Sequence, residues 1–180
     1  LRLHQHIHHG IWEFDFPATQ RRKKFYLRNE RIEGEPPHYV EVDFMKEQLT
    51  DVFAHSGIPK GPALVLWEGV SMYVTEDVVR NTLITCREYF GPGTIMLFDY
   101  WHDKMEDPLR NLLVKLMPLV MDVIYNERFT FGATPAELRA LALDCGAKRF
   151  ESNTGKQMMT KLLLTSRLPL VSASMAVVEF

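Results

Sequence analysis

The stretch PALVLWEGVSMY, residues 62–73, decides how the chain can fold. Its apolar run ALVLW lies between turn residues, a pattern typical of a strand that is buried on both faces within a parallel sheet. Glu68, Gly69 and Tyr73 follow where this strand should end. Because ligands of open α/β sheets bind at the carboxyl ends of the strands, we expect these residues to form the wall of a site. Alternatively, Glu68 and Gly69 are only turn residues that follow a strand.

Predicted strands and helices alternate on both sides of this stretch. Strand patterns cover residues 11–16, 38–44, 63–67 and 94–100, and helical patterns separate them at 19–29, 46–55 and 76–90. Such alternation implies an α/β fold, with a mostly parallel sheet and helices on both faces. Terminal strands are expected at 148–151 and 174–180, and we predict one domain over residues 1–180.

The second half of the chain departs from this simple alternation. Residues 109–125 form a long apolar helical segment that contains Pro118, which removes a backbone hydrogen bond and should bend or split the helix. We interpret this segment as a lid over the site, within an insertion at residues 104–133, although a core helix would show the same pattern. Residues 134–137 (TPAE) predict a capped helix start.

Composition excludes several classes of protein. A net charge of −2 over 180 residues gives no electrostatic reason to expect nucleic acid binding. Cys86 and Cys145 are too few for a disulfide framework, which favours a reducing, cytoplasmic compartment. No signal peptide is visible, and no apolar run approaches the roughly 18 residues of a membrane helix. The chain begins at Leu1 within what reads as structured sequence, so we expect an N-terminally truncated fragment.

Four of the seven histidines lie in the first ten residues, LRLHQHIHHG. Histidine clusters can bind metals, but here neither a cysteine nor a carboxylate accompanies them closely. A solvated loop or a strand edge explains them equally well, and we predict no metal site.

Acidic residues end three successive predicted strands: Asp15, Asp43 and Glu68. In a parallel sheet their side chains should gather along one edge, where an acid can accept hydrogen bonds from both ribose hydroxyls of a nucleotide. Asp43 is followed by Phe44, a pair that suits an adenine ring. Each acid taken alone could also be a helix cap or a turn residue.

Four sequence motifs together resemble a known family. They are WEFDFPATQRRKK at residues 12–24, YVEVDF at 39–44, LVLWEGVSMYVTEDVV at 64–79 and GTIMLFDY at 93–100. These motifs resemble the leucine carboxyl methyltransferase family, in particular its bacterial branch of polyketide carboxyl O-methyltransferases. The resemblance implies a Rossmann-like class I methyltransferase fold with an antiparallel last strand, and S-adenosylmethionine as cofactor.

The resemblance also implies roles for individual residues. Asp15 would hold the cofactor ribose, the pair Asp43 and Phe44 would meet the adenine, and Glu68 would lie near the methionine part of the cofactor. Tyr73 would lie in the same wall near the substrate, and as the best local donor it is our candidate for orienting the methyl acceptor.

One feature of the family is missing from this sequence. The family's first strand and its Gly-rich loop, with the pattern G-x-G-x-D-x-R, should precede Asp15 and do not. Arg2 would be the last remnant of that loop and would then also contact the cofactor.

The predicted activity is S-adenosylmethionine-dependent O-methylation of a carboxylate, on a small molecule or on a protein C-terminus. A carboxylate is ionised at neutral pH and needs no general base, whereas a hydroxyl acceptor would need one, for which His38, His55 and His102 are candidates. A nicotinamide-dependent oxidoreductase and a non-catalytic remnant remain as alternatives. The sequence indicates no oligomeric state.

Overall fold

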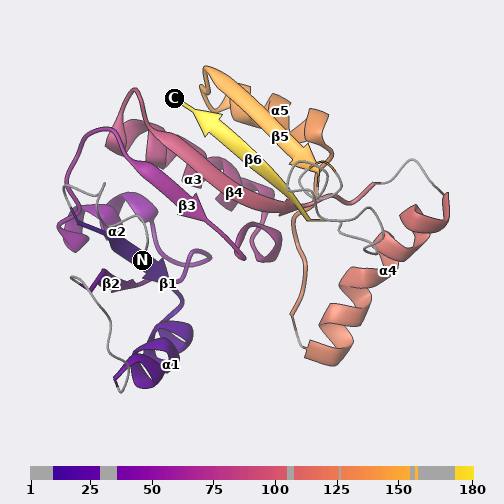
Figure 1. Cartoon of the computed structure of the whole chain (residues 1–180), viewed down its shortest axis with the longest axis horizontal. Helices are drawn as coiled ribbons and strands as arrows, with labels where there is room; N and C mark the ends of the chain where they lie inside the picture. Colours follow the sequence, from indigo (N-terminus) through magenta and orange to yellow (C-terminus); the bar gives the residue numbers. More distant parts are fainter. Residues whose placement is uncertain (1–9, 29–35, 105–107, 126, 155–156, 158–172) are drawn as a thin grey trace. The chain divides into compact units, whose positions relative to one another are not determined.

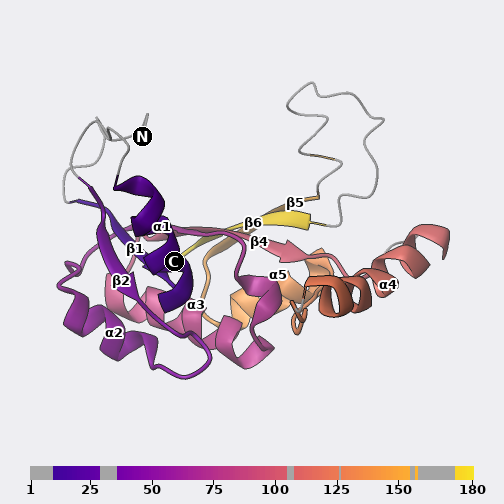
Figure 2. The same ribbon diagram turned by 90° about the horizontal axis from the view of Figure 1, so that it is seen from below.

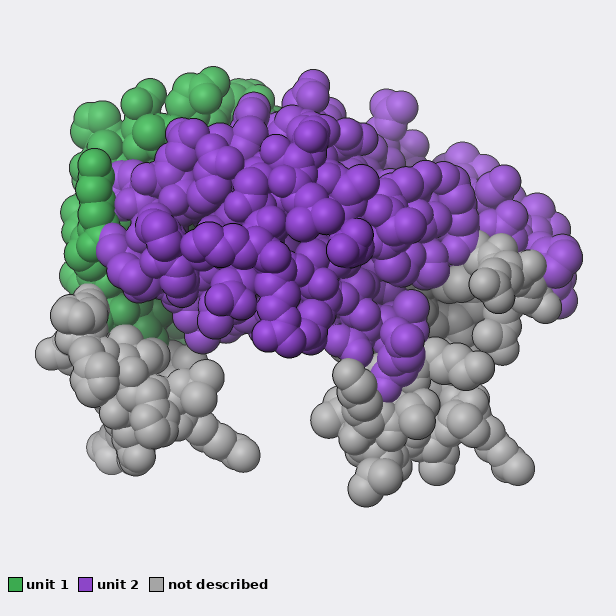
Figure 3. All heavy atoms as spheres, turned by 90° about the horizontal axis from the view of Figure 1, so that it is seen from above, with its two compact units in different colours: residues 1–60 green, residues 61–180 purple. Residues whose placement is uncertain are grey.

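The computed structural model describes residues 10–28, 36–104, 108–125, 127–154, 157 and 173–180. The chain divides into two compact units, residues 1–60 and residues 61–180, coloured separately in Figure 3. Each unit has a sheet of its own. The single domain expected over residues 1–180 stays a prediction.

The first unit is a small α/β unit. Its elements are β1 (Trp12–Asp15), α1 (Pro17–Leu27), β2 (His38–Glu41) and α2 (Leu49–Ser56). The two strands pair in parallel, with Trp12 opposite His38 and Asp15 opposite Glu41. Pro17 can occupy the first turn of α1 because the backbone N–H that proline lacks would have no helical partner there. Because β1 and β2 are parallel, their carboxyl ends lie at the same edge of this two-stranded sheet.

The second unit contains a four-stranded sheet with the order β3-β4-β6-β5 (Figure 1). Its strands are β3 (Leu64–Trp67), β4 (Ile95–Trp101), β5 (Arg149–Thr154) and β6 (Ala173–Glu179). The remaining elements are the short 3-10 helix η2 (Ser71–Tyr73) and the helices α3 (Glu76–Phe90), α4 (Pro108–Tyr125) and α5 (Pro135–Asp144). β3 and β4 are parallel, whereas β6 runs antiparallel to both of its neighbours. The predicted antiparallel last strand is confirmed.

The core of the second unit lies on one face of this sheet. Met96, Phe98 and Tyr100 alternate along β4 and are fully buried, together with Leu83 of α3 and Leu138 of α5. Figure 2 shows α3 and α5 on the same side of the sheet. Two-residue periodicity along the strand therefore selects which side chains enter the core.

The opposite face of this sheet shows that one sequence-based prediction was wrong. Residues 63–67 were predicted to be buried on both faces, but Leu64 and Leu66 are 63% and 59% exposed. Leu64 lies opposite Ile95 of β4, which is also exposed. The apolar run is continuous, yet alternate side chains point to a face that no described element of this unit covers.

The helix α4 runs through Pro118 without a break. The proline therefore does not split the helix, because losing one backbone hydrogen bond is not enough to end a helix of 18 residues. The start of α5 is as predicted: Thr134 Oγ1 accepts a hydrogen bond from the Glu137 N–H, and Glu137 Oε2 accepts one from the Thr134 N–H. This reciprocal pair is a capping box.

Candidate functional site

Two of the predicted acids lie at the same edge of the first unit. Asp15 ends β1, and its carbonyl oxygen accepts a hydrogen bond of 2.9 Å from the Val42 N–H, one residue before Asp43. Asp15 Oδ1 accepts a second bond of 2.7 Å from the Phe16 N–H at the start of α1. In the described part of the chain, Asp15 Oδ2 has no hydrogen-bond partner and can accept from a ligand hydroxyl.

Asp43 is held within a turn. Its Oδ1 accepts a bond from the Met45 N–H at 3.1 Å, and its Oδ2 lies 2.9 Å from Lys46 Nζ. The hydrogen bond from Lys46 is the main reason that the pKa of Asp43 is lowered from its ordinary value. Phe44, the expected adenine cover, is half-buried in the same turn. These contacts fit the turn-residue alternative as well as a ligand role.

In the second unit, Glu68 follows β3 beside a carboxylate of the neighbouring strand. Trp67 pairs with Phe98, so Glu68 comes next to Asp99 of β4. Glu68 is exposed, and within the described residues it forms no ion pair. It can therefore meet a cationic group at the carboxyl end of β3.

Asp99 fixes the loop after β3, a role that the sequence analysis did not assign. Its Oδ1 accepts a hydrogen bond of 2.8 Å from the Gly69 N–H, and its carbonyl oxygen accepts one from Ser71 Oγ. Gly69 has φ of 68°, a left-handed conformation that favours glycine. The sequence signal that could have predicted this contact is the position of an acidic residue near the end of the adjacent strand.

Tyr73 lies in η2, and its hydroxyl donates a hydrogen bond of 2.8 Å to Glu127 Oε2. Its ring contacts Phe129 edge-on, with centroids 5.3 Å apart. Burial raises the pKa of Tyr73 to about 12, with further contributions from Glu127 and Asp99. The hydroxyl therefore stays protonated at neutral pH and acts as a donor.

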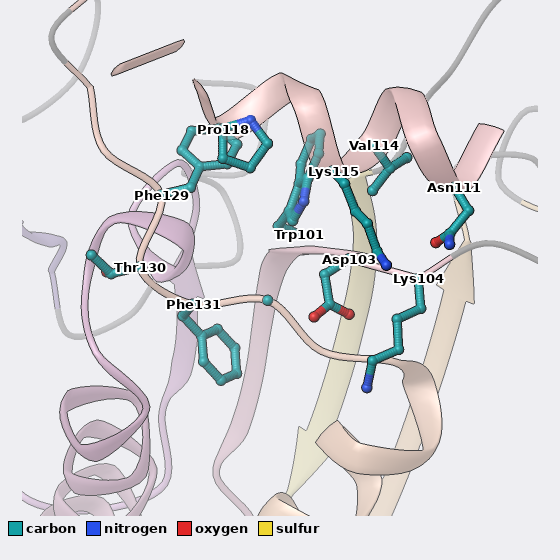
Figure 4. A pocket seen from close by; sticks show the side chains of 11 residues that line it. Trp101, Asp103, Lys104, Asn111, Val114, Lys115, Pro118, Phe129, Thr130 and Phe131 are labelled. Atoms are coloured by element: carbon teal, nitrogen blue, oxygen red, sulfur yellow. The ribbon is translucent and has the colours of Figure 1, made fainter. Parts of the chain in front are cut away.

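A cavity of about 520 Å³ lies beneath α4, close to the end of β4 (Figure 4). Its apolar wall includes Trp101, Val114 and Phe129, and its polar wall includes Asp103, Lys104, Asn111, Lys115 and Thr130. Phe129 also packs against Tyr73, which itself does not line the cavity. The predicted acceptor-orienting tyrosine and the cavity are thus neighbours that share one aromatic wall.

Two charged side chains of the cavity are fixed by their surroundings. Lys104 Nζ lies 2.5 Å from Glu137 Oε1, and this contact, followed by the hydrogen bonds from Thr134, lowers the pKa of Glu137 to about 2. The backbone at Gly132 approaches Asp103 so closely that a Cβ there would lie 2.8 Å from Asp103 Cβ. The position thus requires glycine for steric reasons.

The other candidate residues have ordinary structural explanations or lie outside the described residues. His38 stacks on Trp12, and His55 Nδ1 lies 2.7 Å from the Asp51 carbonyl oxygen. Burial lowers the pKa of His102, which favours its neutral form. Arg2 and the N-terminal histidines are not among the described residues. Across the described ranges, no three metal-ligating side chains gather into a group.

Residues 1–86 match the sequence model of the leucine carboxyl methyltransferase family. The predicted family resemblance is confirmed over these residues, which make up slightly less than half of the chain. The matched range contains every residue that the sequence analysis assigned to the cofactor or to the acceptor, whereas the cavity residues 101–132 lie beyond it. No sequence among the curated proteins matches the chain significantly.

Solved methyltransferase structures share the fold. A provisionally assigned O-methyltransferase from Nostoc punctiforme PCC 73102 gives a TM-score of 0.61 at 12% identity, over 95% of this chain and 45% of that one. Human N-acetylserotonin methyltransferase in complex with S-adenosylmethionine gives 0.56 at 16% identity, over 92% of this chain and 39% of that one. An O-methyltransferase family protein from Burkholderia thailandensis gives a TM-score of 0.55 at 14% identity, over 92% of this chain and 42% of that one.

These alignments establish the Rossmann-like methyltransferase fold. The chain spans less than half the length of these three proteins. None of the described helices combines the length and the apolar character that crossing a membrane requires.

Proposed function

We propose that this chain forms part of an S-adenosylmethionine-dependent O-methyltransferase whose acceptor is a carboxylate, on a small molecule or on a protein C-terminus. The observation that carries the proposal is the EGVSMY stretch, residues 68–73, which lies within the family match and is fixed at the carboxyl end of β3 by Asp99. Open α/β sheets bind their ligands at this end.

The residues present fit the cofactor. Asp15 has a carboxylate oxygen available for a ribose hydroxyl, and the exposed Glu68 can meet the positive end or the amino group of the cofactor. Asp43 with Phe44 is assigned to the adenine. When bound, S-adenosylmethionine supplies an activated methyl group on a sulfonium. Arg2 keeps its assignment to the cofactor as a sequence-based prediction.

The protein's own contribution to the reaction is positioning. A carboxylate acceptor is already ionised at neutral pH, so the chain has no proton to remove from it. Methyl transfer is an in-line displacement, and aligning the acceptor oxygen with the methyl group supplies most of the acceleration. Tyr73 is assigned to this alignment, because its hydroxyl remains a donor across the neutral range. Its bond to Glu127 must then be exchanged for one to the acceptor.

The test is the pH dependence of methyl transfer from labelled S-adenosylmethionine. The rate should stay flat from about pH 6 to pH 8, since an acceptor with a pKa near 4 is ionised throughout this range. Tyr73→Phe should lower turnover more than cofactor affinity. A rate that rises about tenfold per pH unit would indicate a hydroxyl acceptor with a general base and would overturn the carboxylate assignment.

A further inference from the structure

The cavity beneath α4 has one wall suited to an apolar ring. Trp101 and Val114 are 9% and 1% exposed, and both belong to a buried cluster with Met72. Phe129 contacts Trp101 edge-on at 5.1 Å between ring centroids. The volume of about 520 Å³ lies within the range of small-molecule sites.

The two lysines of the cavity differ in their availability to a ligand. Lys104 is paired with Glu137 at 2.5 Å, so its charge is already compensated. Lys115 is exposed and forms no ion pair with any described residue. Figure 4 shows its side chain extending from α4 into the space that Asp103 also faces. Among the described residues that line this cavity, Lys115 is thus the cation that a ligand anion can pair with.

Asp103 provides an unsatisfied acceptor in the same cavity. Its Oδ1 is buried and has no hydrogen-bond partner within the described part of the chain. The close approach of Gly132 restricts how far the side chain can move away. Because a buried carboxylate oxygen without a donor is unfavourable, a ligand hydroxyl or ammonium at this position would be stabilised.

We propose that this cavity binds the methyl acceptor and selects a small acid that has an aromatic or branched apolar body and carries a hydrogen-bond donor. Trp101 and Phe129 hold the body, and Asp103 accepts from the donor. Lys115 pairs with the carboxylate, and Tyr73 keeps its assignment to the carboxylate oxygen that receives the methyl group. This inference rests on the proposed methyltransferase function and narrows its acceptor from carboxylates in general to hydroxy or amino acids.

The experiment is a ligand-observed NMR titration with three matched probes. These are 3-phenyllactate, which has the ring, acid and hydroxyl, 3-phenylpropionate, which lacks the hydroxyl, and 3-phenylpropane-1,2-diol, which lacks the acid. Phenyllactate should bind about fivefold more tightly than phenylpropionate, the effect of one hydrogen bond, and more tightly than the diol. Equal affinities for the three probes would overturn the proposal.

Variants assign the two charged contacts. Lys115→Met should weaken both acids about three- to fivefold and leave the diol unchanged, and Lys115→Arg should restore binding. Asp103→Ala should reduce the preference for phenyllactate over phenylpropionate to about one, a ratio that general destabilisation would not change. Lys148→Met, at an exposed lysine away from the cavity, is the matched control. Unchanged acid binding in Lys115→Met would contradict the proposal.

Two further readouts separate the inference from the proposed function on which it rests. Calorimetry with S-adenosylmethionine on the same protein tests the methyltransferase role without any acid probe. Cofactor binding without selective acid binding would overturn this inference alone. Selective acid binding without cofactor binding would support the acid site and overturn its acceptor role. Tighter binding of a peptide ending in leucine than of phenyllactate would instead favour a protein C-terminus as acceptor.

Discussion

The acids that follow strands in residues 1–86 differ in kind from the cavity at residues 101–132. The acids follow strands of both units, and they lie within the family match. The cavity combines aromatic side chains with Lys104, which is paired with Glu137, and Lys115, which forms no ion pair with a described residue; it lies outside that match. Under the proposed function, a cofactor common to the family would account for the matched region, and an acceptor particular to this protein would account for the unmatched one.

The largest expected effect concerns Trp101, which belongs to both the core and the cavity. Trp101→Ala should lower the free energy of unfolding by about 3–5 kcal/mol, since it leaves a large void next to Phe129 and Val114. Urea denaturation measures the loss. Phe25→Ala, at a side chain that is 64% exposed, is the control and should change stability by less than about 0.5 kcal/mol. Similar losses for both variants would mean that Trp101 is not core.

Replacing one glycine of each region with alanine should lower the stability of the protein for different reasons. Gly132→Ala places a Cβ 2.8 Å from Asp103 and should cost about 1–3 kcal/mol through overpacking. Gly69→Ala meets no atom within 4 Å, so its cost of about 1 kcal/mol comes from the left-handed backbone alone. Denaturation of both variants gives the comparison. Replacing Asp103 with Gly, which removes the Cβ that the new methyl group would meet, should reduce the cost of Gly132→Ala only, and a reduced cost of Gly69→Ala as well would refute the steric explanation.

The smallest effect is the pH dependence that Lys104 imposes at the edge of the cavity. The pKa of Glu137 is lowered from 4.5 to about 2 in the folded chain, so its contribution to stability is fully present above about pH 4.5 and is lost as the pH falls towards 2. Because Glu137 is about half exposed, this contribution should be below about 1 kcal/mol. Glu137→Gln keeps the capping interaction and should flatten this part of the stability profile. An unchanged profile would contradict the assignment.

Periodicity and turn chemistry predicted most of the fold. The strands and helices lie within a few residues of their predicted bounds, and Thr134 with Glu137 forms the expected capping box. The prediction that residues 63–67 are buried on both faces was wrong, because an apolar run does not reveal which faces of a strand other elements cover. Leu64 and Leu66 show this limit directly.

The candidate site was predictable only where its residues are local. Asp15, Glu68 and Tyr73 stand beside strand ends that the sequence marks. Glu127, which accepts a hydrogen bond from Tyr73, lies 54 positions away in the sequence, and this contact depends on how the segment after α4 packs. The cavity is likewise lined by residues from β4, α4 and the loop before α5, so no spacing pattern in the sequence predicts it.

The central claim is that the matched strand ends bind S-adenosylmethionine, and a calorimetric titration of the chain and of Asp15→Ala tests it most directly. The unsubstituted chain should bind the cofactor, and the variant should bind it more weakly by roughly 1–3 kcal/mol, because ribose hydroxyl donors would lose their carboxylate acceptor. NAD should give no comparable heat. Unchanged affinity in Asp15→Ala would contradict the ribose assignment, and preferential binding of NAD would contradict the methyltransferase account itself.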